Sequence, residues 1–389
     1  MKKPTILLVH NYYQLSGGED TVFKNEKELL EKNGYNVLTY TRDNKEIKKY
    51  KIFKKIGLFF TSIYSRKTVK DVKKIIKNNE IDIIHVHNTL SLISPSIYYI
   101  GVKHKIPVIQ TLHNFRLLCP NGTFYRENSI CEDCTKKGLK CAIKHKCYRD
   151  SRIQTFISTL ILKIHRFTGI YKKIYYITLT QFNYEKFVSS NIIPQNRLFI
   201  KPNFSNVDNF EVLTKRKKQI LFVGRLEHIK GIELLIETWN KYGAKLPNLK
   251  IYGTGPLKDY CENKITNEKI CNIFLMGQEE HSKVIQELSE SEALILPTQV
   301  YEGFPMTIVE AFSTGTPVLC SNFGNSSAVV IEGVTGYKFS NNCDSIFEAI
   351  NKLGKEKLDY SAIFKHFSEN YTKEKTLKIL NEIYEKIRR

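Results

Sequence analysis

The chain alternates short apolar runs with longer amphipathic segments, and this alternation constrains its fold more than any other feature. Residues 5–10 read TILLVH, and further runs of strand length begin at residues 36, 82, 107 and 175. A second series begins at residues 220, 249, 272, 293 and 317. Continuous apolar strands that alternate with helices are typical of a parallel sheet covered on both faces. Because the series occurs twice, the sequence predicts two doubly wound α/β domains in tandem.

The length of 389 residues also supports two domains. Single hydrophobic cores stop growing near ~250–300 residues, so a chain of this length is expected to build two. A polar, turn-rich segment over residues 201–219 predicts the join. We therefore expect a first domain over 1–205, a second over 206–370, and a final helix over 371–389 that is able to pack back on the first domain.

Positive charge is concentrated in the first half of the chain. The net charge is +21, and residues 1–210 contain 36 Lys and Arg against 16 Asp and Glu, whereas residues 211–389 contain 24 against 23. This asymmetry favours an anionic partner for the first half, such as a lipid surface, a diphosphate or nucleic acid. The alternative is a Lys-rich surface that serves only solubility.

The sequence predicts no membrane-spanning helix and no signal peptide. The first apolar run is short, Pro4 interrupts it, and no small-residue cleavage site follows. The most apolar stretches, such as residues 56–64, fall far below the ~20 residues that a spanning helix needs. We expect a cytoplasmic protein that is peripheral to a membrane at most.

Unusual residues follow the predicted strands, where open parallel sheets bind ligands. After the run at 220–224, Arg225 and Lys230 straddle a strand-to-helix turn, which lets two cations approach one phosphate-sized anion. Exposed loop cations are the alternative. In the first half, Gly17 and Gly18 open a predicted helix and permit close backbone approach to a ligand, although most such pairs are simple turns.

Residues 301–310, YEGFPMTIVE, place two carboxylates around a Gly-Phe-Pro turn. Pro305 is expected as the first residue of a helix, which leaves the amides of Met306 and Thr307 free to favour negative charge. Glu302 and Glu310 then flank an anion site, where carboxylates accept hydrogen bonds from vicinal sugar hydroxyls. A solvated helix residue, or the acid and base of a glycosidase, would also fit the two glutamates.

His113 ends the apolar run at 107–113 and is followed by Asn114 and Arg116. A histidine at this end of a parallel strand is expected to face the ligand side, where it could bond a sugar hydroxyl or position an acceptor. Capping or packing is the alternative. His85 and His87 lie inside a predicted strand, and we expect structural roles for both.

Taken together, these motifs resemble retaining nucleotide-sugar glycosyltransferases of the two-domain GT-B fold, family 4. The resemblance covers nearly the whole chain. It rests on Gly17-Gly18, the segments DIIHVHN and TLHN, Gly224-Arg225 with Lys230-Gly231, the loop YGTGPL at 252–257, and Glu302 with Glu310.

The resemblance implies a role for each matched residue. Arg225 and Lys230 would neutralise the leaving nucleoside diphosphate, Glu302 would hold donor sugar and phosphate, and His113 would contact the transferred sugar. Catalysis of this kind needs no cofactor, because cations and amides stabilise the departing phosphate. Donor contacts are implied for Gly17, Gly18, Gly253, Gly255, Gly303, Phe304, Pro305, Met306, Thr307 and, at the ribose, Glu310. Asn114 and Arg116 are placed on the acceptor side.

A Cys-rich insertion over residues 119–150 departs from the family pattern. Its spacing Cys131-x2-Cys134-x6-Cys141-x5-Cys147 could supply four thiolates to a structural zinc ion. Free thiols in a reducing compartment are the alternative. A similar Cys-bearing loop occurs, by resemblance, in transferases that build bacterial surface polysaccharides.

The basic stretch over residues 42–77 interleaves cations with apolar side chains, which is typical of a segment on an anionic lipid surface. A buried helix with a solvated Lys face is the alternative. We therefore expect transfer of a hexose or N-acetylhexosamine from a nucleotide sugar to a lipid-linked saccharide, on the inner face of the plasma membrane. Two other functions remain open: a nucleic-acid-binding protein with a zinc loop, which would leave the glutamates unexplained, and a nucleotide-sugar epimerase on the same fold.

Overall fold

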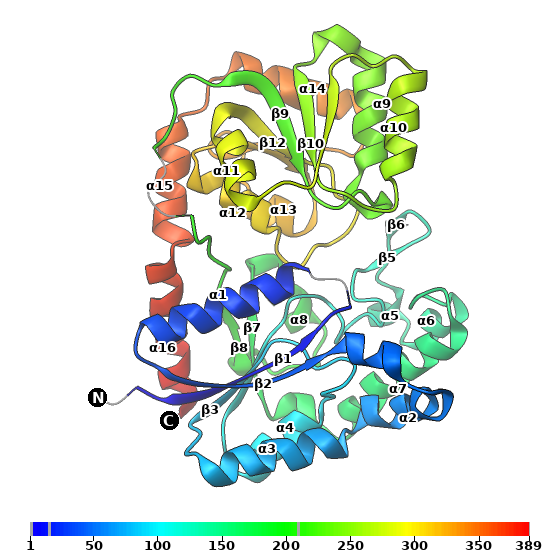
Figure 1. The fold of residues 1–389 in the computed structure, drawn as a ribbon, viewed down its shortest axis with the longest axis vertical. Coiled ribbons are helices and arrows are strands. Elements are labelled where there is room, and N and C mark those ends of the chain that lie inside the picture. Colours follow the sequence, from blue (N-terminus) through cyan, green and yellow to red (C-terminus); the bar gives the residue numbers. More distant parts are fainter. Residues whose placement is uncertain (1–2, 15–16, 208–210, 389) are drawn as a thin grey trace. The chain divides into compact units, whose positions relative to one another are not determined.

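The computed structural model of the chain describes residues 3–14, 17–207 and 211–388, without the side chains of residues 52–56 (Figure 1). Two compact units emerge from it. The first contains residues 1–123, 132–203 and 376–389, and the second contains residues 124–131 and 204–375. The final helix therefore groups with the first unit, and a short piece of the Cys-rich insertion groups with the second.

The first unit is built on a six-stranded parallel sheet with the order β2-β1-β3-β4-β7-β8. Nearly every residue of β1 is buried, as expected for a strand covered on both faces. The strands are β1 (Thr5–Tyr12), β2 (Asn36–Asp43), β3 (Ile83–Val86), β4 (Val108–Thr111), β7 (Tyr175–Thr178) and β8 (Leu198–Ile200).

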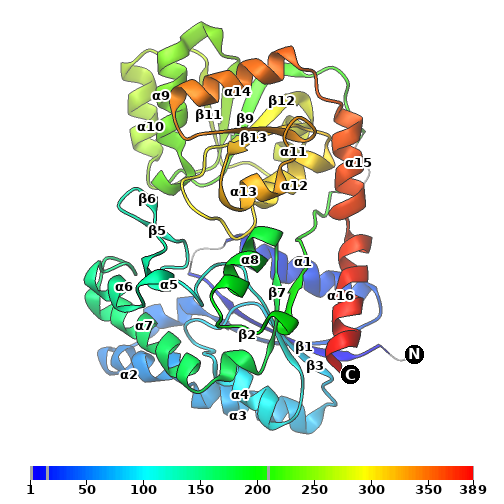
Figure 2. The same cartoon turned by 180° about the vertical axis from the view of Figure 1, so that it is seen from behind.

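Helices connect these strands and cover the sheet (Figures 1 and 2). They are α1 (Gly18–Lys32), α2 (Ile52–Ile63), α3 (Arg66–Asn78), α4 (Ser96–Lys103), α5 (Asp133–Lys136), α6 (Lys140–Lys144), α7 (Arg152–Phe167), α8 (Gln181–Ser189) and α16 (Lys373–Arg388). Short 3-10 turns lie at Asn44–Lys49, Ile170–Lys172 and Gln195–Arg197. Helix α16 places Leu380, Ile383, Tyr384 and Ile387 in one buried cluster with Ile6 and Leu8 of β1.

The second unit repeats the architecture with a six-stranded parallel sheet of order β11-β10-β9-β12-β13-β14. Its strands are β9 (Lys217–Val223), β10 (Asn248–Tyr252), β11 (Ile273–Gly277), β12 (Ser291–Leu296), β13 (Val318–Ser321) and β14 (Gly336–Phe339). Its helices are α9 (Ile232–Tyr242), α10 (Lys258–Asn267), α11 (His281–Glu290), α12 (Met306–Ser313), α13 (Gly324–Val329), α14 (Cys343–Lys355) and α15 (Tyr360–Asn370), with 3-10 turns at His228–Lys230 and Gly243–Lys245.

The predicted fold class is confirmed, because each of the ten apolar runs overlaps one strand of the two parallel sheets. Of the strands in these two sheets, β8 and β14 were not predicted. Within the described ranges, no helix combines the length and the apolar character needed to cross a bilayer.

Candidate functional site

In the second unit, the turn after β9 carries the predicted phosphate-binding cations. Arg225 follows the strand by two residues, and its Nε atom lies 3.3 Å from a carboxylate oxygen of Glu227. Lys230 ends the 3-10 turn, and the Lys230 ammonium lies 2.8 Å from Oε1 of Glu302. This ion pair joins two motifs that are 72 residues apart in the sequence.

Two predicted donor-binding glycines have a structural reason in this fold. A Cβ atom on Gly253 would meet the carbonyl oxygen of Gly224 at 1.9 Å, and one on Gly255 would meet that of Leu226 at 2.4 Å. Gly253 also has φ of 136°, a conformation that L side chains rarely adopt. The absence of a side chain at these glycines allows the loop after β10 to pack directly against the turn after β9. Their role in this site is therefore backbone packing.

The Glu302 turn is held by α13. The Asn325 side-chain amide donates to the carbonyl oxygens of Glu302 and Gly303, the latter at 2.8 Å. The prediction that Pro305 is the first helical residue is wrong by one position: Pro305 is the N-cap, and α12 begins at Met306. Asn325 was missed in the sequence, because nothing in a Gly-Asn dipeptide identifies the loop that it will fix.

Three further residues of this motif are half-buried. Phe304 is half-buried and packs against a hydrophobic cluster of the second unit that includes Tyr371. Met306 and Thr307, also half-buried, stand in the first turn of α12. Backbone amides at such a position lack intrahelical acceptors and favour an anion.

Glu310 contacts a histidine that the sequence did not indicate. Its Oε1 lies 3.0 Å from Nε2 of His281, at the first residue of α11. The hydrogen bond to Glu310 raises the pKa of His281 above its ordinary value, more than burial lowers it. Glu310 is therefore a carboxylate that already has one hydrogen-bond partner in the protein, at Oε1.

In the first unit, Gly17 and Gly18 lie at the start of α1 and are exposed. Gly17 is the N-cap, and its amide donates to Oδ2 of Asp20 at 3.2 Å. Among the described residues, a Cβ atom added to either glycine would meet no atom within 4 Å, which is compatible with close approach of a ligand.

Asn114 and Arg116 follow β4 and form a cluster with Glu19 of α1. The side-chain amide of Asn114 donates to Oε1 of Glu19 at 2.6 Å. The side-chain oxygen of Asn114, Oδ1, accepts from the backbone amide of Arg116 at 3.0 Å. Burial raises the pKa of Glu19 against the opposing effect of the Arg116 charge. The guanidinium of Arg116 also lies over the Tyr148 ring, 5.8 Å from its centroid. Glu19 directly follows the glycine pair, but only the fold brings it to Asn114.

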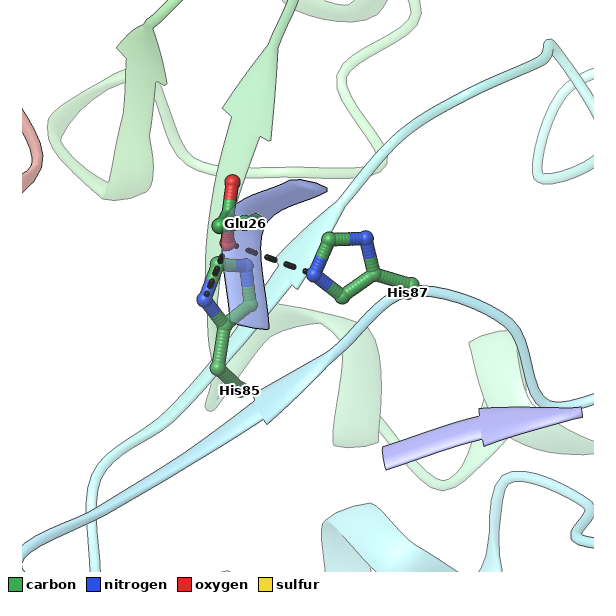
Figure 3. Close-up of side chains that lie close together, drawn as sticks. All are labelled: Glu26, His85 and His87. Atoms are coloured by element: carbon green, nitrogen blue, oxygen red, sulfur yellow. Dashed lines mark ion pairs between the residues drawn. The ribbon is translucent and has the colours of Figure 1, made fainter. Parts of the chain in front are cut away.

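His113 belongs to a buried row of three imidazoles in the first unit. Its Nε2 lies 3.0 Å from Nδ1 of His87, and the stacked rings of His85 and His87 lie 4.8 Å apart. Figure 3 shows one carboxylate oxygen of Glu26, Oε1, in contact with both His85 and His87; it lies 3.1 and 3.3 Å from their ring nitrogens. The other Glu26 oxygen, Oε2, accepts from the Lys201 ammonium at 2.7 Å.

The electrostatics of this cluster keep the imidazoles neutral. Burial lowers the pKa of His85 to about 3, and it also lowers the pKa values of His87 and His113. Burial alone would raise the pKa of Glu26, but the Lys201 charge and the two imidazoles outweigh it and hold that pKa well below its ordinary value. The cluster therefore contains a carboxylate, an ammonium and three neutral rings.

Glu26, His85 and His87 have ligand atoms close enough for one metal ion, all within 4.8 Å of one another. The surroundings do not suit a cation, however. Lys201 already neutralises Glu26, and the Nδ1 atom of His85 lies 2.7 Å from the Tyr384 hydroxyl. A buried divalent ion beside an ammonium would be strongly disfavoured. We therefore interpret this group as a hydrogen-bonded network.

The Cys-rich insertion forms two short helices and a hairpin. The hairpin pairs β5 (Tyr125–Arg126) with β6 (Ser129–Ile130), and Glu127 and Asn128 have the positive φ values of a type I′ turn. Asn128 Oδ1 lies 2.9 Å from Nε2 of His228, two residues before Lys230. Cys134 is buried, whereas Cys131, Cys141 and Cys147 are half-buried.

Comparisons with known proteins found a family match in each of two regions of the chain. Residues 204–373 match the family described as glycosyl transferases group 1, and residues 16–133 match glycosyltransferase family 4. A Klebsiella pneumoniae protein described as an uncharacterized 41.2 kDa protein in the cps region is 24% identical over 362 residues, covering 89% of this chain and 87% of that one.

Other relatives match over shorter regions. An uncharacterized glycosyltransferase of Methanocaldococcus jannaschii is 31% identical over 142 residues, covering 35% of this chain and 36% of that one. The lipopolysaccharide 1,2-N-acetylglucosaminetransferase of Salmonella typhimurium is 28% identical over 145 residues, covering 34% and 38%. The match spans between 29% and 48% of the length of the first curated relatives.

Solved structures show the same fold over the whole chain. The lipopolysaccharide outer core galactosyltransferase WaaB superposes with a TM-score of 0.67 at 16% identity, covering 97% of this chain and 98% of that one. Anabaena HepE in complex with UDP and glucose gives 0.66 at 15% identity and 99% coverage of both. The chain therefore has the GT-B fold. Within this fold, the match to glycosyl transferases group 1 lies in the second unit and the match to glycosyltransferase family 4 lies in the first part of the chain.

The buried imidazoles predict a specific acid sensitivity. Their folded pKa values lie below the unfolded value of ~6.5, so the unfolded chain binds more protons and stability falls as the pH drops below ~6.5. Each ring contributes at most about 1.4 kcal/mol per pH unit. We expect His87→Gln to reduce the pH dependence of the free energy of unfolding between about pH 4 and 6. The exposed control His104→Gln should not change it, and equal slopes in both variants would contradict the prediction.

Proposed function

We propose that the protein is a retaining glycosyltransferase that moves a hexose or N-acetylhexosamine from a nucleotide-diphosphate sugar to a lipid-linked saccharide of a surface polysaccharide. The observation that carries the proposal is the pairing of Lys230 with Glu302, which shortly precedes the first turn of α12. This arrangement combines a cation, the backbone amides of a helix start and a carboxylate, and these groups suit the binding of a sugar diphosphate. The similarity to capsule-region and lipopolysaccharide proteins supports this substrate class.

In the proposed mechanism, Arg225 and Lys230 stabilise the charge that develops on the departing diphosphate. Glu302 keeps the Lys230 ammonium in place through their 2.8 Å contact, so the cation needs little reorganisation during the reaction. Glu310 accepts hydrogen bonds from the ribose hydroxyls after releasing His281. His113 contacts the transferred sugar, and Asn114 and Arg116 lie on the acceptor side. Neither a metal ion nor a cofactor is needed for these steps.

A panel of nucleoside diphosphates tests the donor site. We expect one of UDP, GDP, ADP and dTDP to raise the melting temperature of the wild type, because a ligand at 100 Kd stabilises a protein by about 2.7 kcal/mol. Glu310→Ala should abolish this shift. The matched control is His281→Ala, which removes the protein partner of Glu310 but keeps the carboxylate, and it should retain the shift.

If no diphosphate at millimolar concentration shifts the wild type, the donor site is contradicted and nucleic acid becomes the better ligand. An epimerase would instead convert the nucleotide sugar without any acceptor, which product analysis reveals.

We also propose that the first unit docks on an anionic membrane. Helices α2 and α7 lie side by side (Figures 1 and 2). Both expose large apolar side chains. Phe60 is 66% exposed, Ile153 74% and Phe167 94%. Exposed cations accompany them on the same or neighbouring helices, namely Lys51, Arg66, Lys67, Arg152 and Lys163. Apolar side chains among cations fit the headgroup region of a bilayer.

Liposome flotation tests this surface. We expect the wild type to float with anionic vesicles at low salt and to be released as salt screens the charges. The double variant Ile153→Ser and Phe167→Ser should float several-fold less. Phe274→Ser is the control, because that side chain is 42% exposed on the second unit. Absence of binding by the wild type at low salt would end the proposal.

Finally, the predicted zinc set of Cys131, Cys134, Cys141 and Cys147 stays a proposal that rests on the spacing of the cysteines, because the metal-capable group found among the described residues, Glu26 with His85 and His87, contains none of them. One zinc per chain is expected in the purified protein by elemental analysis, since four thiolates are a usual structural zinc set. Cys134→Ser should lower the content, whereas the exposed Cys271→Ser in the second unit should not. Substoichiometric zinc that Cys134→Ser does not lower further would overturn this assignment.

A further inference from the structure

The buried imidazoles of the first unit belong to a continuous series of polar contacts that includes a carboxylate and an ammonium group. It runs from the Lys201 ammonium through Glu26 and His87 to His113, with successive contacts of 2.7, 3.3 and 3.0 Å. Lys201, Glu26 and His87 are at most 2% exposed, and His113 at the outer end is 8% exposed. The row therefore connects a fixed charge in the core to the residue proposed to contact the sugar.

Each contact in the row restricts the position of one proton. Glu26 is ionised beside Lys201, so both of its oxygens can only accept. The Nε2 atom of His87 faces Oε1 of Glu26 at 3.3 Å, a contact too poorly aligned to count as a full hydrogen bond. Electrostatics still decides its protonation, because a nitrogen lone pair facing a carboxylate would be repelled. His87 therefore carries its proton on Nε2.

The tautomer of His87 determines which ring nitrogen of His113 carries the proton. A neutral His87 that is protonated on Nε2 has only a lone pair on Nδ1. That lone pair lies 3.0 Å from Nε2 of His113, so this nitrogen must be the donor. A neutral His113 with its proton on Nε2 keeps Nδ1 unprotonated.

We propose that Glu26 and His87 are positioning residues that fix His113 in the Nε2–H tautomer and so make its Nδ1 atom a hydrogen-bond acceptor for a hydroxyl group of the ligand. Because the Glu26 carboxylate can only accept hydrogen bonds, the ring proton of His87 is placed on Nε2, and the ring proton of His113 is then placed on Nε2 as well. This proposal depends on the proposed sugar transfer only for the identity of the hydroxyl; the tautomer itself follows from the contacts within the first unit.

The neighbouring groups are consistent with this assignment. His85 is oriented by Tyr384 at 2.7 Å and by Thr111 at 2.8 Å, so it does not compete for Nδ1 of His87. His10 pairs with Asp20 at 2.7 Å. His113 also lines a cavity of about 50 Å³ together with Asn88, Gln110, Asn114 and Ser158. Such a polar cavity is large enough for ordered water and too small for a sugar ring.

The first experiment reads the tautomer directly from the wild-type protein. Long-range ¹H–¹⁵N correlation spectra of protein labelled with ¹⁵N-histidine distinguish the two neutral tautomers and the imidazolium, and His113→Asn assigns the resonance. We expect an Nε2–H tautomer for His113 that does not titrate between about pH 6 and 8. An Nδ1–H tautomer or a titrating ring would overturn the proposal, whether or not any nucleotide binds.

The second experiment reverses the direction of the hydrogen bonds between residue 26, His87 and His113. In Glu26→Gln, the amide oxygen is expected to stay on Lys201, so the amide NH₂ faces His87 and donates to Nε2. His87 is then protonated on Nδ1, and His113 must switch to Nδ1–H. The exposed control Glu80→Gln in the same unit should leave the spectrum unchanged. An unchanged His113 tautomer in a folded Glu26→Gln protein would contradict the relay; if the variant does not fold, the wild-type spectrum still decides.

The kinetic consequence separates this proposal from the donor site. With the nucleotide sugar identified by the diphosphate panel, Glu26→Gln should lower kcat/KM by about tenfold to a hundredfold, the usual effect of one lost hydrogen bond at a buried group. The melting shift given by the nucleoside diphosphate should not change, since that ligand has no transferred sugar. A normal kcat/KM together with an inverted tautomer would show that Nδ1 of His113 does not accept a ligand hydroxyl.

Discussion

The ion pair between Glu26 and Lys201 is the constraint on which the first unit depends. It joins α1 to the residue that follows β8, and the two side chains are at most 1% exposed. A charge without its partner in such a place costs about 3–5 kcal/mol, so neither residue can be replaced alone without cost. The same carboxylate also orients His85 and His87. One buried charge thus fixes a helix, a sheet edge and a row of imidazoles together.

Within the described part of the second unit, the loops that carry the candidate site are positioned without a buried ion pair of this kind. There the loops at the carboxyl ends of the strands are held mainly by backbone packing, with carbonyl oxygens of Gly224 and Leu226 close to the glycines of the next loop. Such contacts leave side chains free, and the cations of the turn after β9 remain partly exposed: the side chain of Arg225 is 47% exposed and that of Lys230 is 30% exposed. A rigid backbone that presents accessible charges suits the binding of an anion that must also be released.

Much of the fold could be predicted from the sequence, because parallel strands buried on both faces produce continuous apolar runs. Two strands of the parallel sheets were not predicted, and they show the limit of this signal: β8 has only three residues, and β14 contains Gly336 and Lys338 within its four. The motif residues were found for a similar reason, since each follows a strand. Their partners were not, because His281, Asn325 and Glu19 reach the motifs only through tertiary packing. No periodicity in the chain encodes such a contact.

The contact between His281 and Glu310 has a thermodynamic consequence. In the proposed donor complex, a ribose hydroxyl that took Oε1 of Glu310 would compete with His281, which lies 3.0 Å from that oxygen. A ligand that displaces the imidazole from this oxygen lets the pKa of His281 return toward its ordinary value. Near neutral pH, a fraction of the protein molecules would then release the proton of His281 to the solution. The measured heat of nucleotide binding would include the ionisation heat of the buffer, and affinity would rise as the pH increases through the range in which His281 titrates.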